Sequence, residues 1–167
     1  AEDSSVEHYT EYGYKALETG DLLNQRFQII KELGSGGFAT TYLASDRQLK
    51  QVKCAVKQLQ PKFNSPSVWT SAKERLATEA MVLQWLGKHP QIPEFIGHFE
   101  ENKQFYLVLE FIEGEEFEQE IHRQMLNEAQ AVDFLVDILG ILKSVHQQGI
   151  IHRDIKPANV MLVEGTK

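Results

Sequence analysis

The sequence predicts an α+β fold in which a five-stranded antiparallel sheet with one helix precedes a mainly helical region. Two observations lead to this prediction. Five short runs rich in β-branched and aromatic residues fall within residues 26–112, with glycine or polar turn residues between them. After Gly114 the apolar residues recur at helical spacing instead. The sheet and helix are therefore assigned to residues 26–112, and the helical region to residues 113–167.

Composition limits the classes of function. The 167 residues are 42% apolar, enough for a core, and 25% charged, as in a globular surface. A net charge of -7 disfavours a nucleic-acid partner or contact with an anionic membrane. Cys54 is the single cysteine, which excludes an internal disulfide and suits a reducing compartment. No apolar run approaches the roughly 20 residues that span a bilayer. We therefore expect a cytoplasmic chain.

Residues 1–25 are expected to form an N-terminal extension. They show little apolar periodicity, and their opening stretch, AEDSSVEHYTEYGYK, is acidic and polar, unlike a signal peptide. Two interpretations stay open. The segment is either a loosely held tail or a segment docked by its aromatic side chains onto the body or a partner. The tyrosines concerned are Tyr9, Tyr12 and Tyr14.

The strands are expected as a meander of three followed by a pair. The first three runs are FQIIKELG, TTYLASD and KCAVKQL, separated by SGGFA and RQLKQV. A polar loop with Pro61 and Pro66 follows, and SAKERLATEAMVLQWLG then has helical spacing that stops at Gly87. The last two runs are IPEFIGHF and KQFYLVLEFI, with a turn at Glu101 and Asn102.

Two helices are expected after the sheet. FEQEIHRQ predicts a short one, and Asn127 or Glu128 opens a long one that runs to Gln148 before Gly149. Apolar residues cover most of the long helix, so we expect it to be buried on several sides. Its apolar residues are Val132, Phe134, Leu135, Val136, Ile138, Leu139, Ile141, Leu142 and Val145.

A glycine-rich turn joins the first two strands. Gly34, Gly36 and Gly37 would let backbone N–H groups approach a phosphate without a Cβ in the way. A plain hairpin turn explains the same glycines equally well. A Walker loop is excluded because no Lys-Ser/Thr pair follows, and a Rossmann turn would open a helix rather than a strand.

Lys57 on the third strand is the next candidate. A lysine between apolar strand neighbours usually faces outward, but beside a glycine turn it can reach phosphates. Such a lysine needs a carboxylate to hold it, and the following helix offers Glu74 and Glu79. We favour Glu79 because it is next to Ala80 on the apolar stripe and faces inward.

The string HRDIKPAN contains the most specific group of polar residues. Asp154 can accept a proton from a hydroxyl nucleophile, Lys156 can balance phosphate charge, and Asn159 can hold a metal ion. As a surface loop the segment would be unremarkable. The pattern Asp-x-Lys-x-x-Asn directly after His-Arg is, however, a highly specific motif. It also follows the glycine turn and Lys57 in the expected order along the chain.

These motifs together resemble those of protein kinases of the Ser/Thr type, most closely the eukaryotic-like kinases of bacteria, over residues 26–163. The resemblance implies a kinase fold, ATP and Mg²⁺ as cofactors, and a protein substrate. It implies that Asp154 is the catalytic base and that Lys57 pairs with Glu79 of the C-helix. Leu109 would be the gatekeeper of the hinge. The nucleotide-binding residues implied are Leu33, Gly34, Ser35, Gly36, Gly37, Phe38, Ala39, Thr41, Ala55, Lys57, Glu79, Leu109, Glu110, Ile112, Glu116 and Met161.

Within that set, the backbone of Glu110 and Ile112 would bind adenine and Glu116 would bind ribose. Leu33, Ala55 and Met161 would sandwich the adenine ring.

The sequence departs from the family pattern in two ways. Ala39 replaces the third glycine and Thr41 replaces an apolar residue, both mild changes. The 167 residues also contain no Asp-Phe-Gly and no Ala-Pro-Glu. We therefore expect a fragment of a longer kinase, without phosphotransfer activity of its own. Engineering, proteolysis and natural truncation would each produce such a fragment, and we favour the first two.

Two other classes of function were weighed. A non-catalytic nucleotide-binding or scaffold module, like a pseudokinase, remains the alternative. An aminoglycoside- or choline-type kinase is disfavoured by Lys156 and the HRD-type loop. The acidic run EGEEFEQE would attract basic substrates, but a solvated helix face explains it as well.

Finally, the long helix suggests self-association, because an exposed apolar surface is normally covered by a partner. We expect a homodimer or higher oligomer through residues 128–148. Phe134, Leu135, Ile138 and Leu142 would lie in or near the interface.

Overall fold

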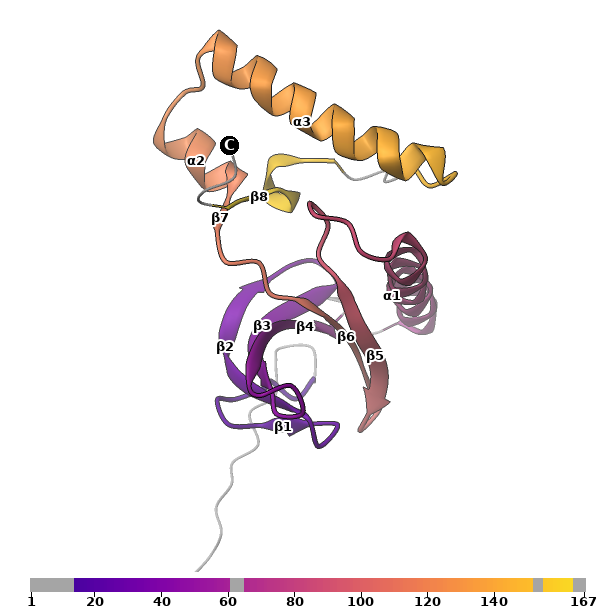
Figure 1. Cartoon of the computed structure of the whole chain (residues 1–167). Helices are drawn as coiled ribbons and strands as arrows, with labels where there is room; N and C mark the ends of the chain where they lie inside the picture. Colours follow the sequence, from indigo (N-terminus) through magenta and orange to yellow (C-terminus); the bar gives the residue numbers. More distant parts are fainter. Residues whose placement is uncertain (1–13, 61–64, 152–154, 164–167) are drawn as a thin grey trace, which may run out of the picture. The chain divides into compact units, whose positions relative to one another are not determined.

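The computed structural model describes residues 14–60, 65–151 and 155–163, which fall into two compact parts (Figure 1). The sheet part comprises the chain up to Gly87 together with Glu94–Phe111. The helical part comprises Lys88–Pro93 and the chain from Ile112 onward. The sheet part therefore takes in described residues that lie before the predicted boundary at residue 26.

The sheet part is built on one curled antiparallel sheet (Figure 1). The predicted fold class is confirmed, with six strands instead of five. The added strand, Leu22–Leu23, pairs with Phe27 and Gln28, and two residues are too few to show a periodicity. In sheet order the strands are β1 (Leu22–Leu23), β2 (Phe27–Ser35), β3 (Ala39–Asp46), β4 (Val52–Leu59), β6 (Gln104–Glu110) and β5 (Phe95–Glu101).

The turn between β5 and β6 differs by one residue from the prediction. Asn102 and Lys103, with φ of 51° and 62°, occupy its two central positions. Positive φ at both positions suits the right-handed twist of a hairpin.

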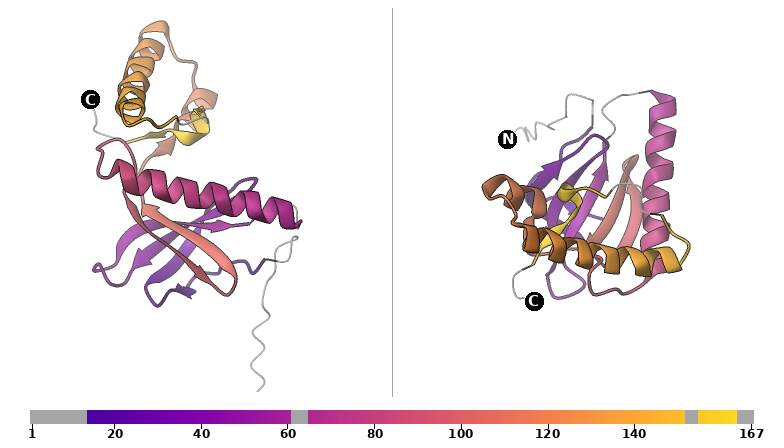
Figure 2. Two further views of the ribbon diagram at one scale, coloured as in Figure 1. Left: turned by 90° about the vertical axis from the view of Figure 1, so that its right-hand side faces the viewer. Right: turned by 90° about the horizontal axis from the view of Figure 1, so that it is seen from above.

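Each face of the sheet buries its own apolar cluster. Helix α1 (Pro66–Leu86) lies across one face (Figure 2), where Leu76 and Ala80 pack with Leu59 and Leu107. The other face holds a second cluster. Its buried members are Leu23, Phe27, Ile29, Tyr42, Ala44, Cys54, Val56, Tyr106 and Val108.

Helix α1 begins at Pro66 rather than at Ser71, where it was predicted to begin. The Ser65 hydroxyl accepts a hydrogen bond from the Val68 N–H at 3.4 Å and so caps the helix. Proline is favourable in the first turn because its missing N–H has no partner there anyway. Gly87, with φ of 63°, ends the helix as predicted.

The helical part contains α2 (Phe117–Arg123), α3 (Glu128–Gln147) and a two-stranded sheet of β7 (Glu115–Glu116) and β8 (Met161–Leu162). Asn127 caps α3 in a reciprocal box with Gln130, so Asn127 is the residue that opens the long helix. The Phe117 ring of α2 stacks on Phe134 of α3 with centroids 3.9 Å apart.

Helix α3 is less buried than its composition predicts. Val145 is its buried residue, and Phe134 is half-buried against α2. The apolar residues that are instead exposed are Val132, Leu135, Val136 and Leu139. Among the described residues, no helix is long and apolar enough to cross a membrane.

Candidate active site

The strand register brings four of the predicted residues onto one face of the sheet. Thr41 lies opposite Lys57, and Lys57 lies opposite Leu107. Ala55, two residues before Lys57, lies opposite Leu109. Directly opposed residues share a face, as do residues two apart. Thr41, Ala55, Lys57 and Leu109 therefore lie on the face that α1 covers.

The predicted pairing of Lys57 with Glu79 is present in the structure. Lys57 Nζ lies 2.7 Å from Glu79 Oε1, and the two side chains are 30% and 38% exposed. Glu74, the competing carboxylate, is exposed on the same helix. So accessible an ion pair contributes only about 0–1 kcal/mol to stability. What the pair does show is that the Lys57 amine reaches α1 from its strand.

The glycine-rich turn is a hairpin between β2 and β3. The Gly36 N–H donates to the Ala39 carbonyl at 2.8 Å and closes the turn. At Gly34 and Gly37 an added Cβ would meet no atom within 4 Å, so there is open space beside this backbone. Phe38 is exposed in the turn, and its ring lies 4.9 Å from the Arg75 guanidinium of α1.

Polar side chains anchor this hairpin, and two of them, Thr40 and Gln60, were not predicted from the sequence. Ser35 and Thr40 join their hydroxyls at 3.1 Å, and Thr40 Oγ1 donates to Gln60 Oε1 at 3.1 Å. The Gln60 N–H donates to the Phe38 carbonyl at 2.7 Å. Nothing in the local sequence distinguishes Gln60 from a solvated residue after a strand.

Glu110, at the end of β6, is bonded twice to Glu94. Its N–H donates to the Glu94 carbonyl at 2.8 Å, and its Oε2 accepts from the Glu94 N–H at 3.0 Å. Because the N–H of Glu110 already donates to Glu94, the backbone contact predicted between Glu110 and adenine would have to be made by the Glu110 carbonyl oxygen.

The catalytic-loop residues are only partly covered by the structure. Asp154 lies outside the described residues. Lys156 and Asn159 are exposed at either end of a tight turn, in which the Asn159 N–H donates to the Lys156 carbonyl at 2.9 Å. Within the described ranges, no three histidine, cysteine or acidic side chains gather as a metal site.

Two further predicted residues meet across the small sheet of the helical part. Glu116 of β7 lies directly opposite Met161 of β8. Gly114 permits this pairing, because a Cβ there would collide with the backbone carbonyl of Leu162. From the sequence, Gly114 was expected only to mark the boundary before the helical region, and this role was not predicted.

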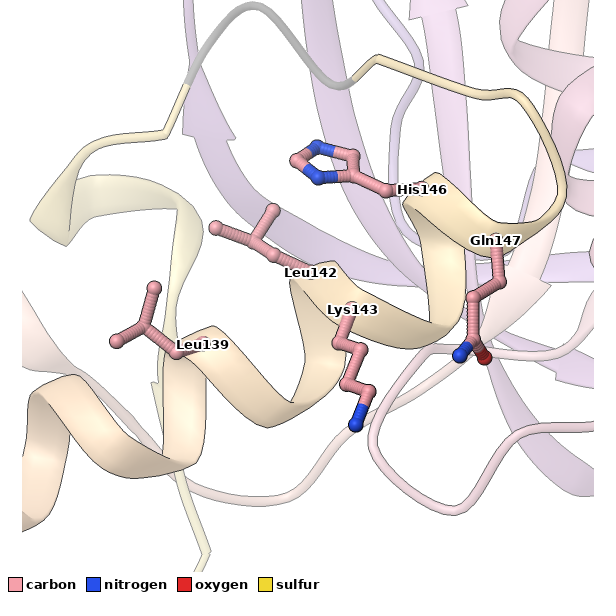
Figure 3. A pocket seen from close by; sticks show the side chains of 5 residues that line it. All are labelled: Leu139, Leu142, Lys143, His146 and Gln147. Carbon is pink, nitrogen blue, oxygen red and sulfur yellow. The ribbon is translucent and has the colours of Figure 1, made fainter.

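A hollow on α3 lies apart from the residues predicted to bind nucleotide. It has a volume of about 460 Å³ and opens widely to solvent; Figure 3 shows its lining side chains along the last turns of the helix. None of the residues predicted to bind nucleotide lines it. The lining residues are Leu139, Leu142, Lys143, His146 and Gln147.

Two buried groups of the sheet part are chemically inert near neutral pH. Burial raises the pKa of the Cys54 thiol to about 11 and the pKa of the Tyr106 hydroxyl to about 12. Neither group is ionised under ordinary conditions, so neither serves as a nucleophile.

A curled antiparallel sheet with a glycine hairpin, and a strand lysine paired with a helix glutamate, has the architecture of a kinase lobe. The chain matches the protein kinase domain over residues 27–167 and belongs to that family. The resemblance drawn from the motifs is thereby confirmed.

Its relatives include bacterial Ser/Thr kinases. The chain is 43% identical over 144 residues to serine/threonine-protein kinase PknA of Nostoc sp., covering 84% of this chain and 26% of that protein. It is also 43% identical over 141 residues to serine/threonine-protein kinase B of Synechocystis sp., covering 83% and 25%. The chain thus spans about a quarter of the length of these relatives.

Solved structures agree on the fold. The apo form of PpkA-294 superposes with a TM-score of 0.77 at 25% identity, covering 89% of this chain and 58% of that one. The PknI kinase domain of Mycobacterium tuberculosis gives a TM-score of 0.73 at 24% identity, covering 89% and 58%.

Proposed function

We propose that this chain forms the ATP-binding and catalytic-loop portion of a serine/threonine protein kinase. The reaction would transfer the γ-phosphoryl group of ATP to a hydroxyl of a protein substrate. The observation that carries the proposal is the Lys57–Glu79 ion pair, because it lies on the sheet face that also holds Ala55 and Leu109. A positioned amine on the same sheet face as apolar side chains suits the phosphates and the base of one nucleotide.

The residues present fit the nucleotide more completely than the metal. Lys57 would meet the phosphates, and the open space at Gly34 and Gly37 would admit them. Bound Mg²⁺ would neutralise phosphate charge. Asn159 would contribute one ligand oxygen to Mg²⁺, but the 167 residues contain no Asp-Phe-Gly aspartate. We therefore expect weak nucleotide binding that Mg²⁺ strengthens little.

The remaining roles rest on the family resemblance. A carboxylate oxygen of Asp154 would accept the proton of the substrate hydroxyl, and the Lys156 amine would balance phosphate charge. We infer a cytoplasmic location because that compartment supplies ATP and keeps a thiol such as Cys54 reduced.

Titration calorimetry with ATP tests the nucleotide site. Lys57→Met should weaken binding about tenfold or more, because a charge-assisted contact to phosphate is lost. Glu79→Gln should weaken it less, since the amine remains. Glu74→Gln is the matched control on the same helix and should change nothing. Unaltered binding by Lys57→Met, or tight binding that requires Mg²⁺, would contradict the proposal.

We propose in addition that α3 mediates self-association. Leu135, one of the predicted interface residues, is 56% exposed, and Leu139 next to it on the helix is 61% exposed. Light scattering should give a dimer mass for the purified chain at tens of micromolar. Leu135→Lys should return the monomer mass, while Asp133→Lys on the same helix should not. A monomeric starting protein would refute this proposal.

A further inference from the structure

The described residues ahead of β1 pack against both faces of the sheet part. Tyr14 is 5% exposed, and its ring meets the Trp69 ring edge-on with centroids 5.6 Å apart. Trp69 lies in the first turns of α1 and meets Phe105 of β6 edge-on at 6.1 Å. Leu17 packs on the opposite face, against the cluster that contains Phe27. The segment is therefore fixed to the sheet and to the start of α1.

A buried amide joins the same segment to the strand that carries Lys57. Gln58 is 0% exposed, and its Nε2 donates to the Lys15 carbonyl at 3.2 Å. The same nitrogen lies 3.1 Å from Gln104 Oε1 and 3.4 Å from the Tyr106 hydroxyl. Burial of a primary amide costs free energy unless its donors are satisfied. The Lys15 carbonyl is one of the acceptors that satisfy them.

From Gln58 the hydrogen bonds continue to the glycine hairpin. Gln60 Nε2 donates to Gln58 Oε1 at 2.5 Å, and Gln60 Oε1 accepts from Thr40 at 3.1 Å. Thr40 in turn meets Ser35. The N-terminal segment thus contacts α1 through an aromatic pair and the hairpin through a buried amide relay. These are the two elements beside Lys57.

We propose that Tyr14 and Lys15 are positioning residues for the nucleotide site, holding α1 and the glycine hairpin in the arrangement that Lys57 requires. The expected effect on ATP binding rests on the proposed function. The effect on the positions of α1 and the hairpin does not. Glu79 follows Trp69 by ten residues, about 15 Å along one helix. A tilt at Trp69 therefore displaces Glu79, and a hydrogen bond of 2.7 Å does not survive a shift of about 1 Å.

Hydrogen–deuterium exchange of the 167-residue chain tests, without any ligand, whether the N-terminal segment holds α1 and the glycine hairpin in place. Tyr14→Ala should speed exchange about tenfold in residues 76–86 of α1 and residues 34–40 of the hairpin. Exchange in β6 should stay within about twofold. Tyr14→Phe keeps the ring and should stay within about threefold of the original rates.

A second variant separates the two routes. Gln58→Leu removes the amide but leaves the Tyr14–Trp69 pair, so exchange should rise in the hairpin more than in α1. Phe99→Leu is a core control on β5, where the Phe99 ring stacks on Phe27 and Tyr106. Its loss of packing lowers stability generally and should not single out the hairpin or α1.

ATP titration of the same variants provides the functional readout. Tyr14→Ala should weaken binding about tenfold, whereas Phe99→Leu should not. If no variant binds ATP, the proposed function fails, but the exchange rates still decide the positioning role. Unchanged exchange in Tyr14→Ala, or acceleration spread evenly over the sheet part as in Phe99→Leu, would overturn the inference.

Discussion

The two parts of the chain differ in how firmly they hold their share of the predicted site. In the sheet part, Lys57 lies on a strand bonded on both sides, above a buried cluster. In the helical part, Lys156 and Asn159 lie on an exposed turn. Among the described residues, Phe117 and Val145 are the buried apolar side chains of that part.

This difference shows where the geometry of each half originates. The hydrogen bonds between the strands fix the register of Thr41, Ala55 and Lys57, so these residues, which are predicted to bind nucleotide, are placed by their own strands. Lys156 and Asn159 lie instead at the ends of a short turn that belongs to no strand ladder. The predicted catalytic-loop residues are therefore not placed by a sheet, unlike the residues predicted to bind nucleotide.

The largest expected effect separates binding from transfer. The 167-residue chain should transfer no phosphate, because it contains no Asp-Phe-Gly. A chimera continued after Lys167 with the matching segment of a 43%-identical relative should transfer it. In that chimera, Asp154→Asn should slow turnover about 10²–10⁴-fold, because the base acts on the hydroxyl and not on ATP.

Radiolabel transfer and ATP calorimetry measure the two quantities side by side. Affinity for ATP should stay the same in Asp154→Asn. Label transfer by the 167 residues alone would contradict this prediction, because it would show that transfer does not require an Asp-Phe-Gly segment.

The next effect tests how firmly the sheet part is held. Asp46 is 1% exposed and receives the Arg26 guanidinium through two hydrogen bonds, at 2.9 and 2.6 Å. Asp46→Asn should lower the free energy of unfolding by about 3 kcal/mol in a urea titration, because it leaves a half-buried cation without its counter-charge. Glu100→Gln, at an exposed position of β5, should change it by less than about 0.5 kcal/mol.

The same pair predicts a pH dependence. The hydrogen bond from Arg26 holds the pKa of Asp46 below its ordinary value. The pair's stabilisation is therefore fully present above the pKa of Asp46 in the unfolded chain, near pH 4. It is lost as the pH falls through the lower pKa of Asp46 in the folded protein. Asp46→Asn should remove this acid-dependent loss. If the unchanged chain and Asp46→Asn lose equal stability in acid, the loss comes from other carboxylates.

The smallest effect concerns the helical part. Gly114→Ala should push β7 and β8 apart, because the new Cβ would overlap the Leu162 carbonyl. We expect a cost of about 1–3 kcal/mol in thermal unfolding. Gly140→Ala on α3 is the control, since a Cβ there meets nothing within 4 Å and alanine favours a helix. Equal stability of the two variants would mean that the small sheet does not hold this part together.

Much of the fold could be predicted from local sequence, because short-range preferences determine it. The β-branched runs predicted five of the six strands of the main sheet, and Gly87 and Asn127 marked helix ends correctly. The contact between Lys57 and Glu79 was also predictable, since a strand followed by an amphipathic helix leaves few inward positions. Its role in nucleotide binding stays a prediction. The Ser65-Pro66 start of α1 was visible as a cap signal but was assigned to a loop.

Tertiary structure alone decided the contacts between distant residues. The pairing of Leu22–Leu23 with Phe27 and Gln28 is not one of these, because it joins residues only four to six positions apart and was missed for its shortness. Gln58 is buried only because Lys15, Gln104 and Tyr106 surround its amide. A glutamine in a strand has no local sign of such an environment, since periodicity reports which face a residue occupies and not which remote groups meet it there. Local preferences were enough to predict five strands of the main sheet, the helices and the Lys57–Glu79 pair, while long-range packing determined how the segment before the sheet is joined to them.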